Sequence, residues 1–93
     1  MIRTFRDKRT EHLAGGKTPR NIAPDVAKRA VNKLFLLDTV TRLEDLRVPP
    51  GNRLEALSGS RRGQHAIRVN DQWRICFVWR NGDAYDVEFV DYH

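Results

Sequence analysis

Apolar residues recur at helical spacing between positions 24 and 38, while the lysines and arginines among them point elsewhere. Pro24 suits a first helical position because its missing N–H has no intrahelical partner there. Asp25 then places a carboxylate in the first turn, where it complements the helix dipole. The pattern predicts a helix over about residues 24–38, whose apolar stripe comprises Val26, Ala30, Val31, Leu34 and Leu37.

The segments around this helix give weaker signals. We expect, in chain order, a short strand at residues 2–6, a short helix at 7–14, a loop at 15–19 and a further helical turn within 39–46. The Pro-Pro-Gly-Asn run at residues 49–52 ends any helix there.

The second half of the chain alternates between apolar and polar residues, as strands do. Strands are predicted at residues 54–57, 65–69, 73–79 and 84–90. The Asn81-Gly82 dipeptide between the last two is a strong hairpin signal.

The apolar pattern also predicts the registers of these strands, because a slip of one residue moves every side chain to the other face. A two-residue loop at Asn81-Gly82 would set acidic residues opposite apolar ones, so we expect a three-residue loop that includes Asp83. This loop pairs Trp79 with Tyr85, Phe77 with Val87 and Ile75 with Phe89. The same reasoning at residues 70–72 pairs Val69 with Trp73 and Ile67 with Ile75.

Together these elements predict an α+β fold, in which N-terminal helices pack on one face of a twisted antiparallel β-sheet. With 93 residues, of which 40% are hydrophobic, the chain can form one modest core. We therefore expect a single domain over residues 1–93, without a separate cofactor domain. Trp73, Phe77 and Trp79 are expected in its core rather than stacked on bases.

The predicted register places Arg68 opposite Arg74 on the second face of the sheet. Like charges directly opposite each other are destabilising. Two arginines kept there indicate an anion between or above them, and a phosphate fits their geometry. The equally weighted alternative is a pair of solvated arginines with Glu88 and Asp86 as acidic partners.

The charge of the chain is concentrated in its middle. The formal net charge is +5, from 17 basic and 12 acidic residues. Residues 47–80 carry seven basic and two acidic side chains, whereas residues 81–93 carry four acidic ones and no lysine or arginine. A localised positive surface favours nucleic acid as a partner, although solubility alone would explain the same net charge.

Composition argues against several other classes. Cys76 is the only cysteine, so an intrachain disulfide and a cysteine-based zinc finger are excluded, and we expect a buried or half-buried, inert thiol. His12 and His65 lack metal-ligand spacing, so no metal is expected. The chain has no apolar run of the roughly 20 residues that span a membrane, and residues 1–6 lack the apolar region of a secretory signal. We therefore expect a cytoplasmic protein.

Several segments closely resemble the RelE/HigB family, the toxins of bacterial type II toxin–antitoxin systems. The resemblance is carried by residues 52–59 (NRLEALSG), 63–70 (GQHAIRVN) and 72–77 (QWRICF). The HigB branch is matched further by residues 1–5, 45–47, 49–52 and the terminal Asp91-Tyr92-His93. The ordered set covers nearly the whole chain and is more specific than any one motif.

This resemblance implies a small ribosome-dependent mRNA endonuclease that cuts mRNA in the A site of the small ribosomal subunit and inhibits translation. It implies helices packed on an antiparallel sheet, which agrees with the pattern above. The implied partner is a HigA-like antitoxin with a helix-turn-helix domain. Operator DNA would be contacted only through the complex with that antitoxin, and neither a cofactor nor a membrane is implied.

The resemblance also assigns site residues. Arg74, Asp91, Tyr92 and His93 lie at family positions, whereas Glu55 stands where characterised HigB toxins commonly have histidine, and Ser58 where they often have lysine. We assign Arg68 and Arg74 to the phosphate and Tyr92 to the nucleotide, and Asp91 either orients His93 or contacts substrate. The general base is left open between Glu55 and His93. Further RNA-binding candidates in the basic middle are Arg53, Arg61 and Arg62.

Two other functions fit the same pattern. A non-catalytic module would bind RNA or the ribosome through the basic face. A ParE-like toxin would use the same fold to poison DNA gyrase, although the paired arginines and the Tyr92-His93 ending argue against it.

Overall fold

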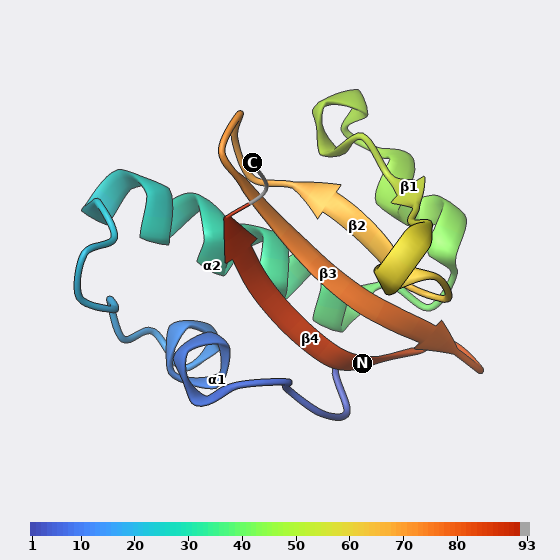
Figure 1. The fold of residues 1–93 in the computed structure, drawn as a ribbon, viewed down its shortest axis with the longest axis horizontal. Coiled ribbons are helices and arrows are strands. Elements are labelled where there is room, and N and C mark those ends of the chain that lie inside the picture. The colour runs from blue at the N-terminus through green and yellow to red at the C-terminus, as the bar shows by residue number, and fades with distance from the viewer. Residues whose placement is uncertain (92–93) are drawn as a thin grey trace.

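A computed structural model describes residues 1–91, in which helices lie against a four-stranded antiparallel sheet (Figure 1). The long predicted helix is α2, Pro24–Thr39, with Pro24 in its first turn. It crosses one face of the sheet and buries Ala27, Ala30, Leu34 and Leu37. The short predicted helix is α1, Lys8–Ala14, which packs beside the last strand and α2. Within residues 1–91, no helix is long and apolar enough to cross a membrane.

The strands follow one another as a meander in the order β1-β2-β3-β4. Their bounds are Glu55–Ala56 for β1, His65–Arg68 for β2, Trp73–Arg80 for β3 and Asp83–Asp91 for β4. Short 3₁₀ turns form at Leu43–Arg47, Pro50–Asn52 and Gly59–Arg61. The predicted turn within 39–46 thus begins at Leu43, and the segment at 49–52 forms a turn of its own.

The segment predicted as a first strand, residues 2–6, runs parallel to the outer edge of β4. Ile2 bridges Ala84 and Phe5 bridges Val87. The amide of Arg3 donates to the carbonyl of Ala84 at 2.8 Å, and the amide of Arg6 donates to that of Val87 at 3.0 Å. The segment therefore pairs through isolated bridges rather than as a continuous strand.

The turn between β3 and β4 differs from the prediction. Arg80 pairs with Asp83, so the loop has two residues rather than three, and Trp79 pairs with Ala84 instead of Tyr85. Asn81 and Gly82 have φ values of 52° and 82°, the left-handed conformations of a tight turn whose twist matches the strands. The local preference of Asn-Gly outweighed the apolar alternation used to choose the longer loop.

A bulge in β4 then restores the alternation. The register shifts between Cys76 and Val78, and Asp86 adopts a left-handed φ of 53° at this point. On the C-terminal side of the bulge in β4, Phe89 pairs with Ile75, which confirms that prediction. The expected Phe77–Val87 pair falls within the irregularity itself. On the N-terminal side of the bulge, Tyr85 pairs with Val78 instead of Trp79. The prediction therefore placed Tyr85 on the wrong face of the sheet.

The pairing of β2 with β3 has the predicted register. Ile67 lies opposite Ile75, and Arg68 lies opposite Arg74. Ile67, Ile75 and Phe89 are fully buried on the face that α2 covers. Trp73 stacks on Phe89 with ring centroids 4.4 Å apart. Phe77 is fully buried in the core, as expected, and Trp73 and Trp79 are half-buried and pack against it.

A buried hydroxyl joins α1 to β4. Thr10 is fully buried, and its Oγ1 accepts a hydrogen bond from the amide of Phe89 at 2.9 Å. Asp7 caps α1 by accepting from the amide of Thr10 at 2.8 Å. Arg9 donates to the carbonyl of Phe89 at 2.7 Å. Thr10 thus satisfies an edge amide that has no other strand beside it at this position.

We expect Thr10→Val to lower the free energy of unfolding by about 1–3 kcal/mol, because it leaves the buried Phe89 amide without its acceptor while keeping the side-chain shape. Urea unfolding followed by circular dichroism measures the loss. Thr39→Val is the matched control, since the Thr39 hydroxyl is exposed and bonds only within α2. Equal stability of the two variants would contradict this role of Thr10.

Candidate functional site

The face of the sheet away from α2, here called the outer face, carries two rows of paired residues. One row crosses all four strands as Glu55, Ala66, Cys76 and Glu88. The next row contains Arg68, Arg74 and Val90. The rows are two residues apart along the strands, which corresponds to about 7 Å. The fold thus brings Glu55, Arg68 and Arg74 onto one surface.

Arg74 is anchored by the loop between β2 and β3. Its Nη1 donates to the carbonyl of Asn70 at 2.6 Å and to that of Trp73 at 3.2 Å. Asn70 in turn shapes this loop, because its Oδ1 accepts from the amides of Gln72 and Trp73. Backbone carbonyls, which are neutral acceptors, therefore hold the guanidinium of Arg74 in position.

Arg68 bonds to an acid that the sequence analysis missed. Its Nη2 forms an ion pair with Asp71, three residues further on in the loop. The hydrogen bond and the charge of Arg68 lower the pKa of the Asp71 carboxyl, and the charges of Arg53 and Arg74 add to the effect. The structure thus gathers Arg53, Arg68 and Arg74 around Asp71. The i, i+3 spacing of Arg68 and Asp71 was the available signal.

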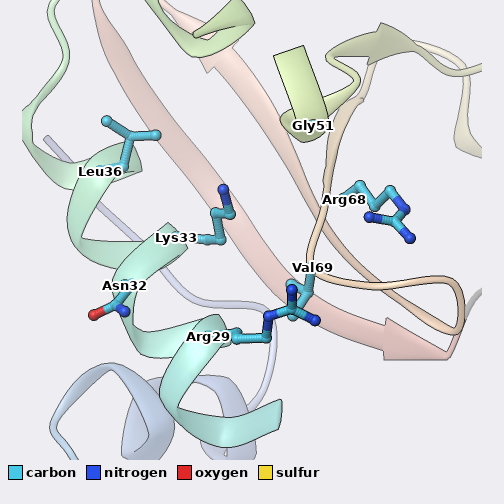
Figure 2. Close-up of a pocket in the computed structure, with 7 residues that line it drawn as sticks. All are labelled: Arg29, Asn32, Lys33, Leu36, Gly51, Arg68 and Val69. Carbon is cyan, nitrogen blue, oxygen red and sulfur yellow. The ribbon is translucent and has the colours of Figure 1, made fainter. Parts of the chain in front are cut away.

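Arg68 also bounds a cleft between the end of β2 and α2 (Figure 2). The cleft has a volume of about 330 Å³. On the α2 side it is lined by Arg29 and Lys33. The sequence analysis did not single out these two residues as site residues, because their helix was read only for its apolar stripe.

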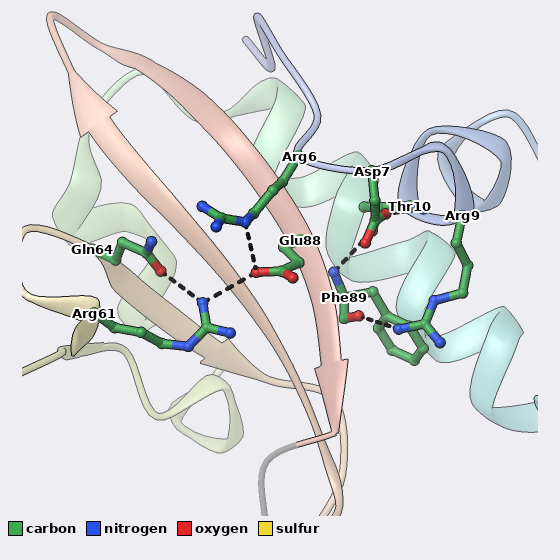
Figure 3. Close-up of polar contacts among 8 residues, drawn as sticks. All are labelled: Arg6, Asp7, Arg9, Thr10, Arg61, Gln64, Glu88 and Phe89. Carbon is green, nitrogen blue, oxygen red and sulfur yellow. Dashed lines mark hydrogen bonds and ion pairs between the residues drawn. The ribbon is translucent and has the colours of Figure 1, made fainter.

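Glu88 on the outer face pairs with Arg61 and Arg6. It accepts from Nη1 of Arg61 at 3.1 Å and lies 3.8 Å from Nε of Arg6 (Figure 3). Arg61 is bound further by Gln64 at 3.0 Å. The acid that pairs with Arg68 is thus Asp71, whereas the alternative named Glu88 and Asp86. The charge of Arg61 is largely offset by Glu88, whereas Arg53 and Arg62 are exposed.

Cys76 lies beneath this network. The thiol is buried, as expected, and burial raises its pKa. The charges of Arg61, Glu88, Arg74 and Glu55 also act on it, and Glu55 and Glu88 stand in the same row of paired residues as Cys76. A thiol kept protonated in this way is not a nucleophile.

Glu55 is exposed on β1 and lines a small cavity of about 90 Å³ together with Arg47 and His65. His65 starts β2, as predicted, and its ring stacks on Phe77 with centroids 6.3 Å apart. The Nδ1 atom of His65 is buried without a hydrogen-bond partner among residues 1–91. His12 is exposed near the end of α1. In the described part of the chain no group of three or more metal-ligating side chains comes together.

Asp91 ends β4 beside the arginine row. It pairs with Trp73, the neighbour of Arg74, and its Oδ2 accepts from Nε2 of Gln72 at 3.0 Å. Tyr92 and His93, the other two residues assigned at this end, lie outside the described residues. Their roles rest on the sequence alone.

Two helices packed on a four-stranded antiparallel sheet are the fold of the RelE-fold toxins YoeB and YafQ. The chain in the YoeB–YefM complex from Staphylococcus aureus matches this structure with a TM-score of 0.57 at 14% identity, and the match covers 100% of this chain and 98% of that one. A mutant of YafQ from E. coli also gives a TM-score of 0.57, at 16% identity, over 98% of this chain and 93% of the other.

The family follows from the sequence comparisons. The model of the HigB-like toxins, described as RelE-like toxins of the type II toxin–antitoxin system HigB, matches residues 3–93, and the chain belongs to this family. Toxin HigB-1 of Vibrio cholerae serotype O1 is 37% identical over 94 residues, which cover 100% of this chain and 98% of that protein. Endoribonuclease HigB of Proteus vulgaris is 33% identical over the whole of both chains. A type II toxin implies an antitoxin as its partner.

Because Asp71 competes for the guanidinium of Arg68, we expect Asp71→Asn to tighten the binding of a short 2′-O-methyl RNA by a few-fold. The effect is small because exposed ion pairs are weak. Fluorescence anisotropy at fixed ionic strength measures it. Asp45→Asn makes the same change of charge at an exposed residue that lines neither the cleft nor the outer face, so equal tightening by both variants would mean that net charge alone acts.

Proposed function

We propose that this HigB-family toxin is an endoribonuclease that enters the ribosomal A site, cuts the bound mRNA and stops translation in the cytoplasm. A HigA-like antitoxin neutralises it, and the pair contacts operator DNA only through that antitoxin. The toxin domain spans residues 1–93. The observation that carries the proposal is the register that sets Arg68 opposite Arg74 on the outer face. Arg68 lies two residues along β2 from Ala66, which is the residue that pairs with Glu55.

RNA supplies its own nucleophile, the 2′-hydroxyl. When this oxygen attacks the adjacent phosphorus, the bond to the 5′-oxygen breaks and a 2′,3′-cyclic phosphate forms. The reaction needs a base for the 2′-hydroxyl proton, an acid for the leaving oxygen and cations for the charge that develops on the phosphate. It can therefore proceed without a metal ion.

Arg68 and Arg74 supply the cations. The two carbonyls that hold Arg74 fix its guanidinium before substrate arrives, which is the condition under which charge stabilisation lowers a barrier most. Arg53 extends the same positive surface and binds the flanking RNA. Arg61 and Arg62 contribute less to RNA binding, since Arg61 is paired with Glu88.

The proton transfers fall to Glu55 and His93. Glu55 is solvent-exposed on the outer face and accessible to a 2′-hydroxyl from that side. Asp91, next in the chain to the terminal pair, orients His93 or contacts the nucleotide, on which Tyr92 stacks. The family position of Glu55 supports this assignment, because a carboxylate can replace histidine as a base.

Removal of Arg74 tests the phosphate assignment. We expect Arg74→Ala to lower the rate of mRNA cleavage on programmed ribosomes by roughly 10²–10³, the cost of one electrostatic donor. Deletion of His93 should also relieve growth arrest on induction, whereas Arg20→Ala, an exposed arginine beside α1, should not.

Mapping of mRNA 5′ ends after brief induction separates the candidate functions. New ends in wild type that are missing in Arg74→Ala support the endonuclease. Ribosome binding without new ends identifies a non-catalytic module, and gyrase inhibition without new ends identifies a ParE-like toxin. Full cleavage by Arg74→Ala would sink the site assignment.

Glu55→Gln keeps the shape of the side chain and removes its basicity. If Glu55 is the general base, single-turnover cleavage should fall by about 10²–10⁴, and Glu55→His should restore much of the rate. Glu44→Gln is the matched control, because Glu44 lines the same small cavity. An unchanged rate for Glu55→Gln would remove Glu55 from the reaction and leave His93 as the base.

A further inference from the structure

The cleft between α2 and the end of β2 combines uncharged residues with charged ones that are all basic. The charged residues that line it are Arg29, Lys33 and Arg68, and no described carboxylate is among its lining. Figure 2 shows Arg29 and Lys33 reaching from α2 toward the strands, while the guanidinium of Arg68 extends away from α2 on the far side. The cleft therefore adjoins the arginines of the outer face.

Lys33 is held in this cleft by a buried amide. Asn52 is fully buried, and its Nδ2 donates to the carbonyls of Leu46 at 3.0 Å and Val48 at 3.2 Å. These bonds orient the side chain so that Oδ1 accepts from Nζ of Lys33. A neutral acceptor thus positions the ammonium and leaves its charge uncompensated.

Arg29 adds a second uncompensated charge. It lies four residues before Lys33, on the same side of α2, where like charges are mildly destabilising. Among residues 1–91, neither Arg29 nor Lys33 forms an ion pair with a carboxylate. Burial of Lys33, together with the charge of Arg29, lowers the pKa of its ammonium. An anion in the cleft would relieve both effects.

We propose that this cleft binds a backbone phosphate of RNA other than the one that is cut, through Arg29 and Lys33. The inference rests on the proposed function in taking RNA as the ligand. Arg68 joins the two sites, because it belongs to the outer face and also bounds the cleft. The phosphate belongs either to the message or to ribosomal RNA, since both offer the same group.

Gly51 offers a direct test, because it lines the cleft and a Cβ added there meets no atom within 4 Å. Gly51→Glu places a carboxylate at the cleft, and Gly51→Gln adds the same bulk without charge. Arg29→Gln removes one cation, and Lys28→Gln makes the same change of charge on α2 outside the cleft. Thermal unfolding of each variant verifies that it folds.

The probes are a short 2′-O-methyl RNA, which cannot be cut, and vacant ribosomes, which hold no message. We expect Arg29→Gln to weaken binding roughly five- to eightfold at 0.1 M salt relative to Lys28→Gln, and to reduce the slope of log K against log salt by about 0.7–0.9. Gly51→Glu should weaken binding relative to Gly51→Gln. A loss with the free RNA assigns the phosphate to the message, and a loss with ribosomes alone assigns it to ribosomal RNA.

Equal affinities within each matched pair on both probes would overturn the proposal, as would a wild-type protein that binds neither the free RNA nor the vacant ribosomes. The proposed function fails separately. If wild type yields no new mRNA 5′ ends but Gly51→Glu and Arg29→Gln still lose affinity for RNA, the endonuclease is refuted and the phosphate site stands.

Discussion

The pairing of Ile67 with Ile75 is the constraint on which both faces of this protein depend. Both side chains are fully buried beneath α2, so the register of β2 against β3 cannot slip by one residue without exposing them. Because strand side chains alternate, the same pairing forces Arg68 opposite Arg74 on the outer face. Burial of the hydrophobic core thus offsets the free-energy cost of placing two like charges opposite each other. The core therefore keeps the charged site assembled in the absence of substrate.

This dependence explains what the sequence could predict. The long helix and the Ile67–Ile75 register follow from apolar periodicity, because burial of large side chains dominates their energetics. The β3–β4 turn did not follow. Asn81-Gly82 demands a two-residue turn, whereas the apolar residues further along demand the register of a three-residue loop. The protein satisfies both by inserting the bulge at Asp86, and periodicity alone does not reveal an extra residue.

The site was predictable to a similar degree. Parity along the strands placed Arg68 and Arg74 on one face, since that depends only on the register, whereas the pairing of β1 with β2 that brings Glu55 to the same face was not predicted. Asp71 and the Lys33–Asn52 contact depend instead on how loops fold back, which no repeating pattern encodes. Arg61, predicted as an RNA contact, forms an ion pair with Glu88 on β4. The two residues are far apart in sequence, so the repeating pattern did not predict this pair either.

The N-terminal segment along β4 has a consequence for the toxin as a free molecule. A sheet edge presents unpaired amides and carbonyls that invite another chain to add a strand. In residues 1–91 one edge is covered by the bridges at Ile2 and Phe5, and the other is β1, which is only two residues long. Met1 and Arg3 further fasten the covering segment through ion pairs to Asp83. Among residues 1–91 the sheet therefore leaves little open edge on which another chain could add a strand.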